Sequence, residues 1–323
     1  MPRRELKAGV STVACCAAAI SVGYVVAVAQ RAAPPSVFTA ADLMSYVSTL
    51  ASASMEGRRT GTPGNVQARA LVVEQFKAAG LTPLGTNYEM PFTFQRRQQG
   101  NAQPAAMSGV NIGGVCRGSG AKDSGAMVIS AHYDHLGVRD GAIYHGADDN
   151  ASGVAILVAL ARQCKQSPWM HDAMLVAFDA EELGLQGARA FVTSPPVPKE
   201  RIAINLNLDM VARGDKGELY IAGTSHTPVL RKVLQPVATS ASIKVLFGHD
   251  SGGGQQDWTT QSDHGAFHAA GIPFLYFGVE DHPDYHRPTD TADKINAKFF
   301  YESARTILNA VDAVDRALPL PTK

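Results

Sequence analysis

Apolar and polar residues along this chain follow two periods, and these periods predict strands that alternate with helices. Short apolar runs such as 126–131 and 173–178 are typical of buried strands. Segments such as 151–164, where apolar residues recur three or four positions apart, are typical of helices. Further strands are predicted at residues 88–95, 110–115, 202–208, 218–222, 243–247 and 272–277. Further helices are predicted at residues 39–52, 67–79, 185–192, 228–240 and 263–270, and at 292–318 as one long helix or two joined ones.

Strands alternating with helices imply an α/β fold with a mostly parallel central sheet and helices on both of its faces. A Pro/Ala linker occupies residues 30–36, and no later linker separates a second apolar core. We therefore expect a single domain over residues 37–323.

The first 29 residues differ from the rest of the chain. Arg3, Arg4 and Lys7 precede an uncharged, Ala- and Val-rich run at 8–29 that ends in Ala-Val-Ala. This order is typical of a secretory signal peptide with a small-residue cleavage site. The run is also long enough to span a bilayer, so an uncleaved anchor stays open as an alternative. We expect export to the periplasm or the medium, with membrane contact only through an uncleaved N-terminal segment.

Composition narrows the range of partners and leaves the redox state open. The formal net charge is +0 and charged residues make up 18% of the chain, which gives no sign of a nucleic-acid-binding surface. After the signal segment only Cys116 and Cys164 remain. Export permits a disulfide between them, but two separate buried thiols fit the sequence equally well.

Potential metal ligands stand where several predicted strands end or a helix begins. These residues are His132, Asp148, the pair Glu181 and Glu182, Asp209 and His286. Because parallel strands end at one edge of a sheet, these side chains can converge there. Two imidazoles and three carboxylates suit zinc. If one carboxylate bridges, they can hold two ions and leave room for a water, and the pair Glu181 and Glu182 offers one ligand and one base.

Five motifs in order carry a resemblance to a known family. They are Ala-His-Tyr-Asp-His at 131–135, Gly-Ala-Asp-Asp-Asn-Ala-Ser-Gly at 146–153, Glu-Glu-Leu-Gly at 181–184, Asn-Leu-Asp-Met at 207–210, and Tyr-His at 285–286 with Asp-Thr at 290–291. Residues from about 54 to 295 resemble the co-catalytic di-zinc aminopeptidases, which include secreted bacterial leucyl aminopeptidases and aminopeptidase Y-like enzymes. The fold that this resemblance implies is that of the zinc exopeptidases, also described as phosphorylase/hydrolase-like.

The resemblance also implies a set of metal ligands. His132 and Asp209 would hold one zinc ion, and Glu182 and His286 would hold the other. Asp148 would bridge the two ions, and the peptide bond that follows it would be cis. The chain would thus bind two Zn²⁺.

Three further residues receive roles from the same resemblance. Glu181 would be the general base, and Tyr285 would stabilise the oxyanion of the intermediate. Asp134 would orient His132 from outside the ligand set, as the imidazole ligands of metals commonly require.

The function expected on this basis is that of an exported zinc metallo-aminopeptidase. It would hydrolyse the N-terminal bond of peptides or proteins through a di-zinc-activated water, and we expect it to be a monomer. A glutaminyl-peptide cyclotransferase with a single zinc and a non-catalytic binding ectodomain are the alternatives.

Three other features of the sequence receive structural interpretations. His135 is expected to be a hydrogen-bonded neighbour of the site and not a ligand. Ser262, Asp263 and His264 are consecutive at a helix start, which favours a cap at the surface over a catalytic trio. The Gly-rich loop at 248–261 is expected to border the substrate cleft.

Overall fold

The computed structural model describes residues 1, 37–96, 105–120, 125–252, 254 and 256–320 of the 323-residue chain. Residues Val37–Lys323 form one compact unit. The predicted signal segment and linker lie outside the described residues except for Met1, so both stay predictions. None of the helices in the described ranges has the length and apolarity that crossing a bilayer requires.

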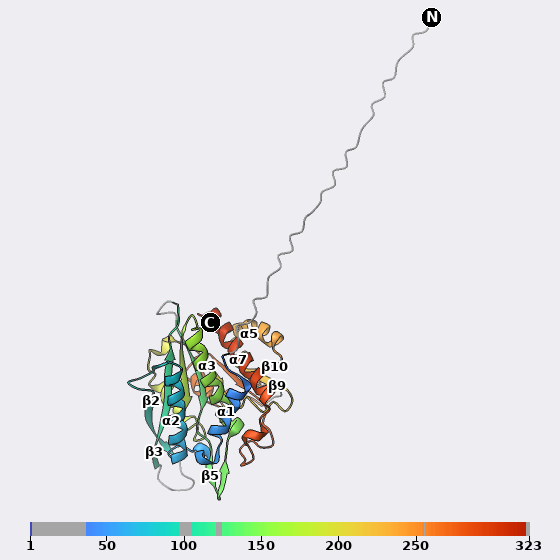
Figure 1. The fold of residues 1–323 in the computed structure, drawn as a ribbon. Coiled ribbons are helices and arrows are strands. Elements are labelled where there is room, and N and C mark those ends of the chain that lie inside the picture. The colour runs from blue at the N-terminus through green and yellow to red at the C-terminus, as the bar shows by residue number, and fades with distance from the viewer. Residues whose placement is uncertain (2–36, 97–104, 121–124, 253, 255, 321–323) are drawn as a thin grey trace. The chain divides into compact units, whose positions relative to one another are not determined.

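A mixed sheet of nine strands forms the centre of this unit (Figure 1). The strand order is β1-β3-β7-β4-β8-β11-β9-β10, with β2 paired to β3. The bounds are β1 Thr82–Pro83, β2 Glu89–Arg96, β3 Ala105–Cys116, β4 Ala126–His132, β7 Asp172–Phe178, β8 Ile202–Leu208, β9 Glu218–Ala222, β10 Lys244–Phe247 and β11 Phe274–Gly278. A separate hairpin joins β5 Gly137–Arg139 to β6 Ala142–Tyr144.

The direction of the strands changes from the centre of this sheet to its flanks. The four central strands, β7, β4, β8 and β11, run parallel to one another. On one side β3 pairs antiparallel to β7, and on the other β9 pairs antiparallel to β11. The predicted α/β fold is therefore confirmed, with a sheet that is mixed and whose parallel part is the centre.

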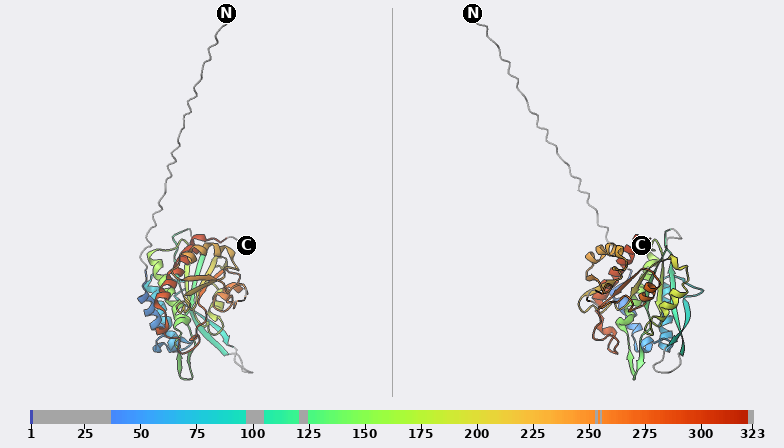
Figure 2. Two further views of the ribbon diagram at one scale, coloured as in Figure 1. Left: turned by 90° about the vertical axis from the view of Figure 1, so that its right-hand side faces the viewer. Right: turned by 180° about the vertical axis from the view of Figure 1, so that it is seen from behind.

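Helices cover both faces of the sheet, as expected. Their bounds are α1 Ala40–Leu50, α2 Pro63–Ala78, α3 Gly153–Gln166, α4 Gln186–Thr193, α5 Pro228–Ser240, α6 His264–Ala269 and α7 Ala297–Ala317. Short helical turns lie at Ala53–Arg58, Ala147–Ser152, Lys199–Arg201 and Ala292–Lys294. Apolar residues of α1, α2, α3, α5 and α7 pack on one face, and those of α4 and α6 pack on the other (Figures 1 and 2).

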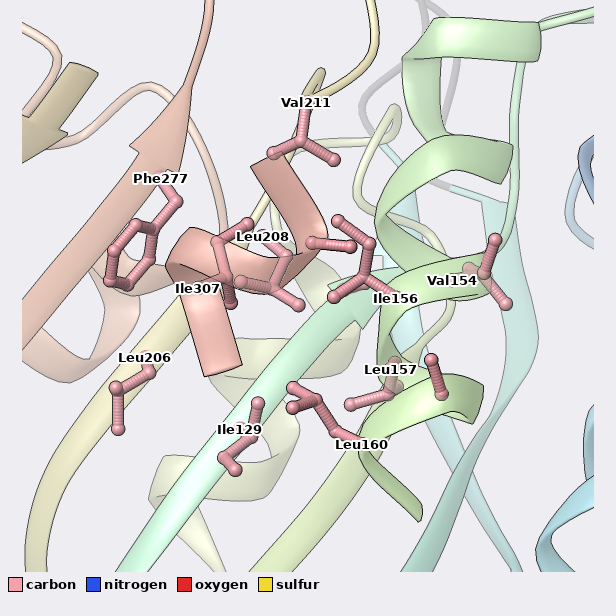
Figure 3. Packing of buried hydrophobic residues seen from close by; sticks show 14 of the residues in the cluster. Ile129, Val154, Ile156, Leu157, Leu160, Leu206, Leu208, Val211, Phe277 and Ile307 are labelled. Atoms are coloured by element: carbon pink, nitrogen blue, oxygen red, sulfur yellow. The ribbon is translucent and has the colours of Figure 1, made fainter. Parts of the chain in front are cut away.

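The largest hydrophobic core of the described residues lies under α3 and α7 (Figure 3). Ile129 on β4, Leu206 on β8 and Phe277 on β11 point to this face and meet Leu157 on α3 and Ile307 on α7. All five side chains are buried. Burying a side chain of this size stabilises the fold by roughly 1.5–3 kcal/mol, so this face fixes the register of the strands that carry the site.

The opposite face of β8 carries polar residues in a hydrogen-bonded ladder. Asn205 donates to Ser130 Oγ at 2.9 Å, and Ser130 donates to Asn207 Oδ1 at 2.7 Å. Asn207 in turn donates to Ser262 Oγ at 2.9 Å. This ladder pairs the hydroxyl of Ser130 and the amide of Asn207, leaves Asn205 Oδ1 without a hydrogen-bond partner among the described residues, and links β4, β8 and the start of α6 beneath the sheet edge.

The two cysteines that the sequence left open are joined. A disulfide connects Cys116 at the end of β3 to Cys164 near the end of α3. It fastens an antiparallel flank of the sheet to the helix that covers its parallel centre.

Candidate metal centre

The carboxyl ends of the four parallel strands meet at one edge of the sheet and bring the candidate ligands together. His132 is the last residue of β4, and Asp209 directly follows β8. Glu181 and Glu182 lie in the turn after β7, and His286 lies in the loop after β11. The turn Ala147–Ser152, just before α3, completes the site.

The first group of potential ligands consists of His132, Asp149 and Asp209. His132 Nε2 lies 3.3 Å from Asp149 Oδ1 and 3.3 Å from Asp209 Oδ1. The three side chains are buried, and their ligand atoms all lie within 4.8 Å of one another. One imidazole nitrogen and two carboxylate oxygens at this spacing can surround a single cation.

The second group uses the other oxygen of Asp149. His286 Nε2 lies 3.1 Å from Asp149 Oδ2 and 3.4 Å from Glu182 Oε2. His135 joins them from another side, with Nδ1 2.7 Å from Glu182 Oε1 and 3.7 Å from Asp149 Oδ2. Asp149 thus stands between the two groups, with one carboxylate oxygen toward each.

The sequence prediction placed Asp148 in this bridging position, and the structure corrects it. Asp148 enters neither group: its Oδ1 accepts from the Ala212 N–H at 2.8 Å, and its Oδ2 lies 3.4 Å from His282 Nε2. Asp149 has an extended backbone, with φ −101° and ψ 92°, and extended backbone sends consecutive side chains in opposite directions. The cis peptide bond is likewise Asp149–Asn150 and not Asp148–Asp149.

Asp290 holds the turn that carries Asp149. Its carboxylate accepts from the backbone N–H of Asp148 at 3.1 Å and from that of Asp149 at 3.1 Å. Burial and the charge of Asp148 raise the pKa of Asp290 to about 6. Asp290 belongs to the Asp-Thr motif at 290–291, for which the sequence predicts no role, and its contacts show that it shapes the turn.

Asp134 positions both His132 and the glutamate pair. His132 Nδ1 lies 3.2 Å from the Asp134 carbonyl oxygen and 3.7 Å from its Oδ1. The Asp134 carboxylate accepts from the N–H of Glu181 at 3.0 Å and of Glu182 at 3.4 Å. The orienting contact expected for His132 is therefore made by a carbonyl, which leaves Nε2 directed at the ligand group.

Asp179 connects the glutamate turn to the rest of the fold. Its carboxylate accepts from the Thr60 hydroxyl at 2.9 Å, the Asn65 amide at 3.1 Å and the Val110 N–H at 2.9 Å. Burial raises the pKa of this carboxyl to about 6. Asp179 thus fixes the position of the glutamates that follow it.

Glu181 lies beside the two groups and faces a cavity of about 410 Å³ that both groups also line. Burial raises the pKa of its carboxyl well above the ordinary value, and the nearby His132 opposes that rise. Met210, Val279 and Trp258 form part of the cavity wall. Trp258 belongs to the loop at 248–261, so this loop borders the cavity beside the candidate ligands; that the cavity takes substrate stays a prediction.

Tyr285 also lines this cavity. Its ring stacks on His286 with the ring centroids 4.0 Å apart. Burial raises the pKa of its phenol, so the hydroxyl remains protonated and can donate a hydrogen bond.

The trio at the start of α6 is buried, and the prediction of a surface cap is wrong. Ser262, Asp263 and His264 are at most 1% exposed, and Asp263 makes no side-chain cap hydrogen bond. His264 Nε2 donates to the Trp258 carbonyl at 2.8 Å, and burial lowers the pKa of its ring to about 3. Tertiary packing buries these three residues, because α6 lies against the sheet below the candidate ligands.

The prediction that His135 is a satisfied neighbour is also wrong. Both of its ring nitrogens are buried, and neither has a hydrogen-bond partner among the described residues. Its 2.7 Å approach to Glu182 Oε1 lacks hydrogen-bond geometry, since that oxygen too is buried without a hydrogen-bond partner.

The donor atoms of the two groups fit a pair of divalent cations. In the described part of the chain, the ion pairs of Asp149, Glu182 and Asp209 are with imidazoles only. Buried carboxylates at this density are costly without a compensating positive charge. Imidazole nitrogens mixed with carboxylate oxygens are the donors that zinc accepts.

Arg58 anchors the backbone beneath both groups, a role that the sequence did not reveal. The side chain is 0% exposed. Its guanidinium donates to the carbonyl oxygens of Leu50 at 2.6 Å, His145 at 2.7 Å, Gly146 at 2.9 Å and Tyr133 at 3.0 Å. Burial lowers its pKa to about 10, so it remains charged at neutral pH. It joins the segment after His132 to the segment before the Asp149 turn.

We expect Arg58→Ala to destabilise the protein by about 3–5 kcal/mol, because it leaves several buried carbonyl groups without their charged donor. Urea titration followed by circular dichroism measures this loss. The matched control is Arg117→Ala, which removes an exposed ion pair to Asp172 and should cost less than about 1 kcal/mol. Equal costs for the two variants would contradict the anchoring role.

The comparisons with known proteins agree with this geometry. The sequence profile of peptidase family M28 matches residues 111–311. Aminopeptidase YwaD of Bacillus subtilis is 30% identical over 213 residues, which cover 62% of this chain and 44% of that protein. The probable lipoprotein aminopeptidase LpqL of Mycobacterium tuberculosis is 34% identical over 180 residues, which cover 47% and 36%. The chain thus spans less than half the length of these two relatives.

Solved structures share the fold over most of the chain. The zinc aminopeptidase BSAP from Bacillus subtilis superposes with a TM-score of 0.70 at 19% identity, covering 88% of this chain and 97% of that one. A glutaminyl cyclase from Bacteroides thetaiotaomicron gives 0.66 at 17% identity, covering 85% and 98%. The predicted resemblance is confirmed, and the chain belongs to peptidase family M28.

Proposed function

We propose that this chain is an exported metallo-aminopeptidase that removes the first residue of peptides with the help of two zinc ions. The observation that carries the proposal is the position of Asp149, whose two carboxylate oxygens face two different sets of ligands. A single cation would leave one of these sets unused. Membership of a peptidase family and similarity to two aminopeptidases support the same conclusion.

The ligands divide between the two ions as the groups do. His132 and Asp209 would hold the first ion, Glu182 and His286 would hold the second, and Asp149 would bridge them. Zinc in such a site acts as a Lewis acid and lowers the pKa of nearby water.

Glu181 and Tyr285 supply the remaining chemistry. Glu181 accepts a proton from the attacking water and delivers it to the departing amine, which is the work of a general base and then a general acid. Tyr285 donates its hydroxyl hydrogen to the carbonyl oxygen, on which negative charge develops. Both side chains line the same cavity.

Selectivity for a free N-terminus follows from the charge of the cavity lining. Glu182 and Asp209 would be neutralised by the zinc ions, but Glu181 and Asp281, which would hold no metal, also contribute to its wall. A substrate α-ammonium is attracted to this acidic lining, whereas an acylated amine carries no charge to attract.

Export rests on the N-terminal segment and on the disulfide. Residues 1–29 have the order of a secretory signal, and a disulfide persists in an oxidising compartment. We therefore place the protein in the periplasm or outside the cell.

Metal analysis together with a substrate panel tests the proposal. We expect about two zinc ions per chain, hydrolysis of aminoacyl-anilides with a free amine, and none of their N-acetyl forms. Removing the metal with a chelator should abolish turnover, and added zinc should restore it. Peptides that begin with glutamine should lose that residue. Their conversion to pyroglutamyl peptides by a protein with one zinc would instead establish the cyclotransferase, and no turnover of either kind would favour a binding domain.

A further inference from the structure

We propose that His135 is a ligand of the second zinc ion through its Nδ1 atom, an inference that rests on the proposed pair of cations. The second ion would then have four protein ligands: Asp149, Glu182, His286 and His135. The first ion would have three, namely His132, Asp149 and Asp209, so the two positions would differ in coordination.

The surroundings of the His135 ring favour a metal ligand. The ring is 1% exposed, and neither nitrogen has a hydrogen-bond partner among the described residues. An imidazole left in this state loses the hydrogen bonds that it makes in water, at a cost of about 1–3 kcal/mol. A metal ion at Nδ1 would compensate for that loss.

The contacts of Nδ1 favour a shared cation over a hydrogen bond. Nδ1 lies 2.7 Å from Glu182 Oε1 and 3.7 Å from Asp149 Oδ2, yet Glu182 Oε1 also has no hydrogen-bond partner. A ring nitrogen and a carboxylate oxygen can lie this close without hydrogen-bond alignment when both point at the same metal ion. The ligand atoms of His135, Asp149 and Glu182 all lie within 4.8 Å of one another.

The surrounding backbone holds the ring in this place. A Cβ atom on Gly146 would lie 2.6 Å from Cγ and Cδ2 of His135, so the ring packs directly on a residue without a side chain. Gly146 has φ +60°, a conformation that favours glycine. Its carbonyl oxygen accepts from Arg58 at 2.9 Å, which fixes the wall behind the imidazole.

The consequence is that the two ions differ in how they are held. Zinc with four protein ligands is coordinatively closed, whereas zinc with three keeps an open position for water or substrate. We therefore expect the second ion to bind more tightly and to be the last that a chelator removes. The first ion, at His132 and Asp209, keeps the open position.

Cadmium-113 and nitrogen-15 NMR on the full chain tests this assignment directly. Protein labelled with ¹⁵N-histidine and loaded with ¹¹³Cd²⁺ should show metal coupling to the imidazoles of His132, His286 and His135, the last through Nδ1. The variant His135→Ala should lose one coupling and bind the second ion at least about 100-fold more weakly, more than a residue outside the ligand set costs. The control His145→Ala, whose ring hydrogen-bonds to the Ala51 carbonyl, should keep all three couplings.

The outcomes separate the two hypotheses. Two bound cadmium ions with coupling to only His132 and His286 overturn the role of His135 and leave the proposed function intact. Binding of one cadmium ion or none overturns the proposed pair of cations itself. Because the count of couplings comes from the unmutated protein, it decides the matter even if His135→Ala fails to fold.

Discussion

Asp149→Asn should remove most of the bound metal and lower kcat/KM by about 10³-fold or more, whereas the neighbouring Asp148→Asn should keep the metal. The reason is geometric, since Asp149 directs one oxygen toward each ligand group. An amide offers a single neutral oxygen and a nitrogen without a lone pair for the metal. Loss of a metal ion removes several kcal/mol of transition-state stabilisation, and each 1.4 kcal/mol corresponds to a factor of ten.

Asp148→Asn is the matched control because it changes the same charge one residue earlier. Its Oδ1 accepts from the Ala212 N–H and its Oδ2 lies near His282, so an amide keeps the main acceptor. We expect a loss of about 1–2 kcal/mol of unfolding free energy and unchanged zinc content by elemental analysis. The opposite result, with Asp148→Asn free of metal and Asp149→Asn fully loaded, would restore the assignment made from sequence.

The contrast between these two aspartates shows where sequence reasoning stops. The motif at 146–153 identified the turn, and its place before α3 at the edge of the sheet was expected. The dihedral angles of Asp149 decide which of the two adjacent carboxylates joins the ligand groups. The periodicity of the sequence carries no information about the angles of a single turn. An error of one residue is enough to exchange ligand and non-ligand.

The elements themselves were predictable because their patterns are strong. The helix expected at 39–52 is α1, Ala40–Leu50, and the strand expected at 202–208 is β8, Ile202–Leu208. The second helix begins earlier than expected, at Pro63, since Thr62 caps it and proline suits a first helical turn. The hairpin β5–β6 was missed, since its strands have three residues each.

The buried polar residues were the least predictable part of the site. Arg58, His135 and Asp263 are all polar residues in or beside turns, where the sequence favours exposure. Each is at most 1% exposed, since tertiary packing brings distant segments over it. The sequence holds a signal for two of these three residues. Arg58 stands in a turn-rich loop, and His135 is the second histidine of the motif at 131–135. Neither signal says what the side chain contacts.

Glu181→Gln should retain both metal ions and lose most of the turnover, with kcat lower by about 10²–10⁴-fold, the usual contribution of a general base. Glutamine has nearly the shape of glutamate but cannot accept a proton at neutral pH. Glu181 makes no ion pair with the ligand imidazoles among the described residues, so the metal should remain. Zinc analysis and steady-state kinetics on an aminoacyl-anilide measure the two effects separately.

The pH profile adds a second measurement of the same role. A general base acts in its deprotonated form, so turnover should fall as the pH falls through the pKa of Glu181. Burial raises that pKa, and the two zinc ions would lower it. Glu181→Gln should lack this acidic limb. The control is Glu182→Gln, which alters a carboxylate in the second ligand group and should lose metal as well as turnover. Full activity of Glu181→Gln with both ions bound would show that another group is the base. The next carboxylate to substitute would then be the buried Asp263, whose charge raises the pKa of Glu181.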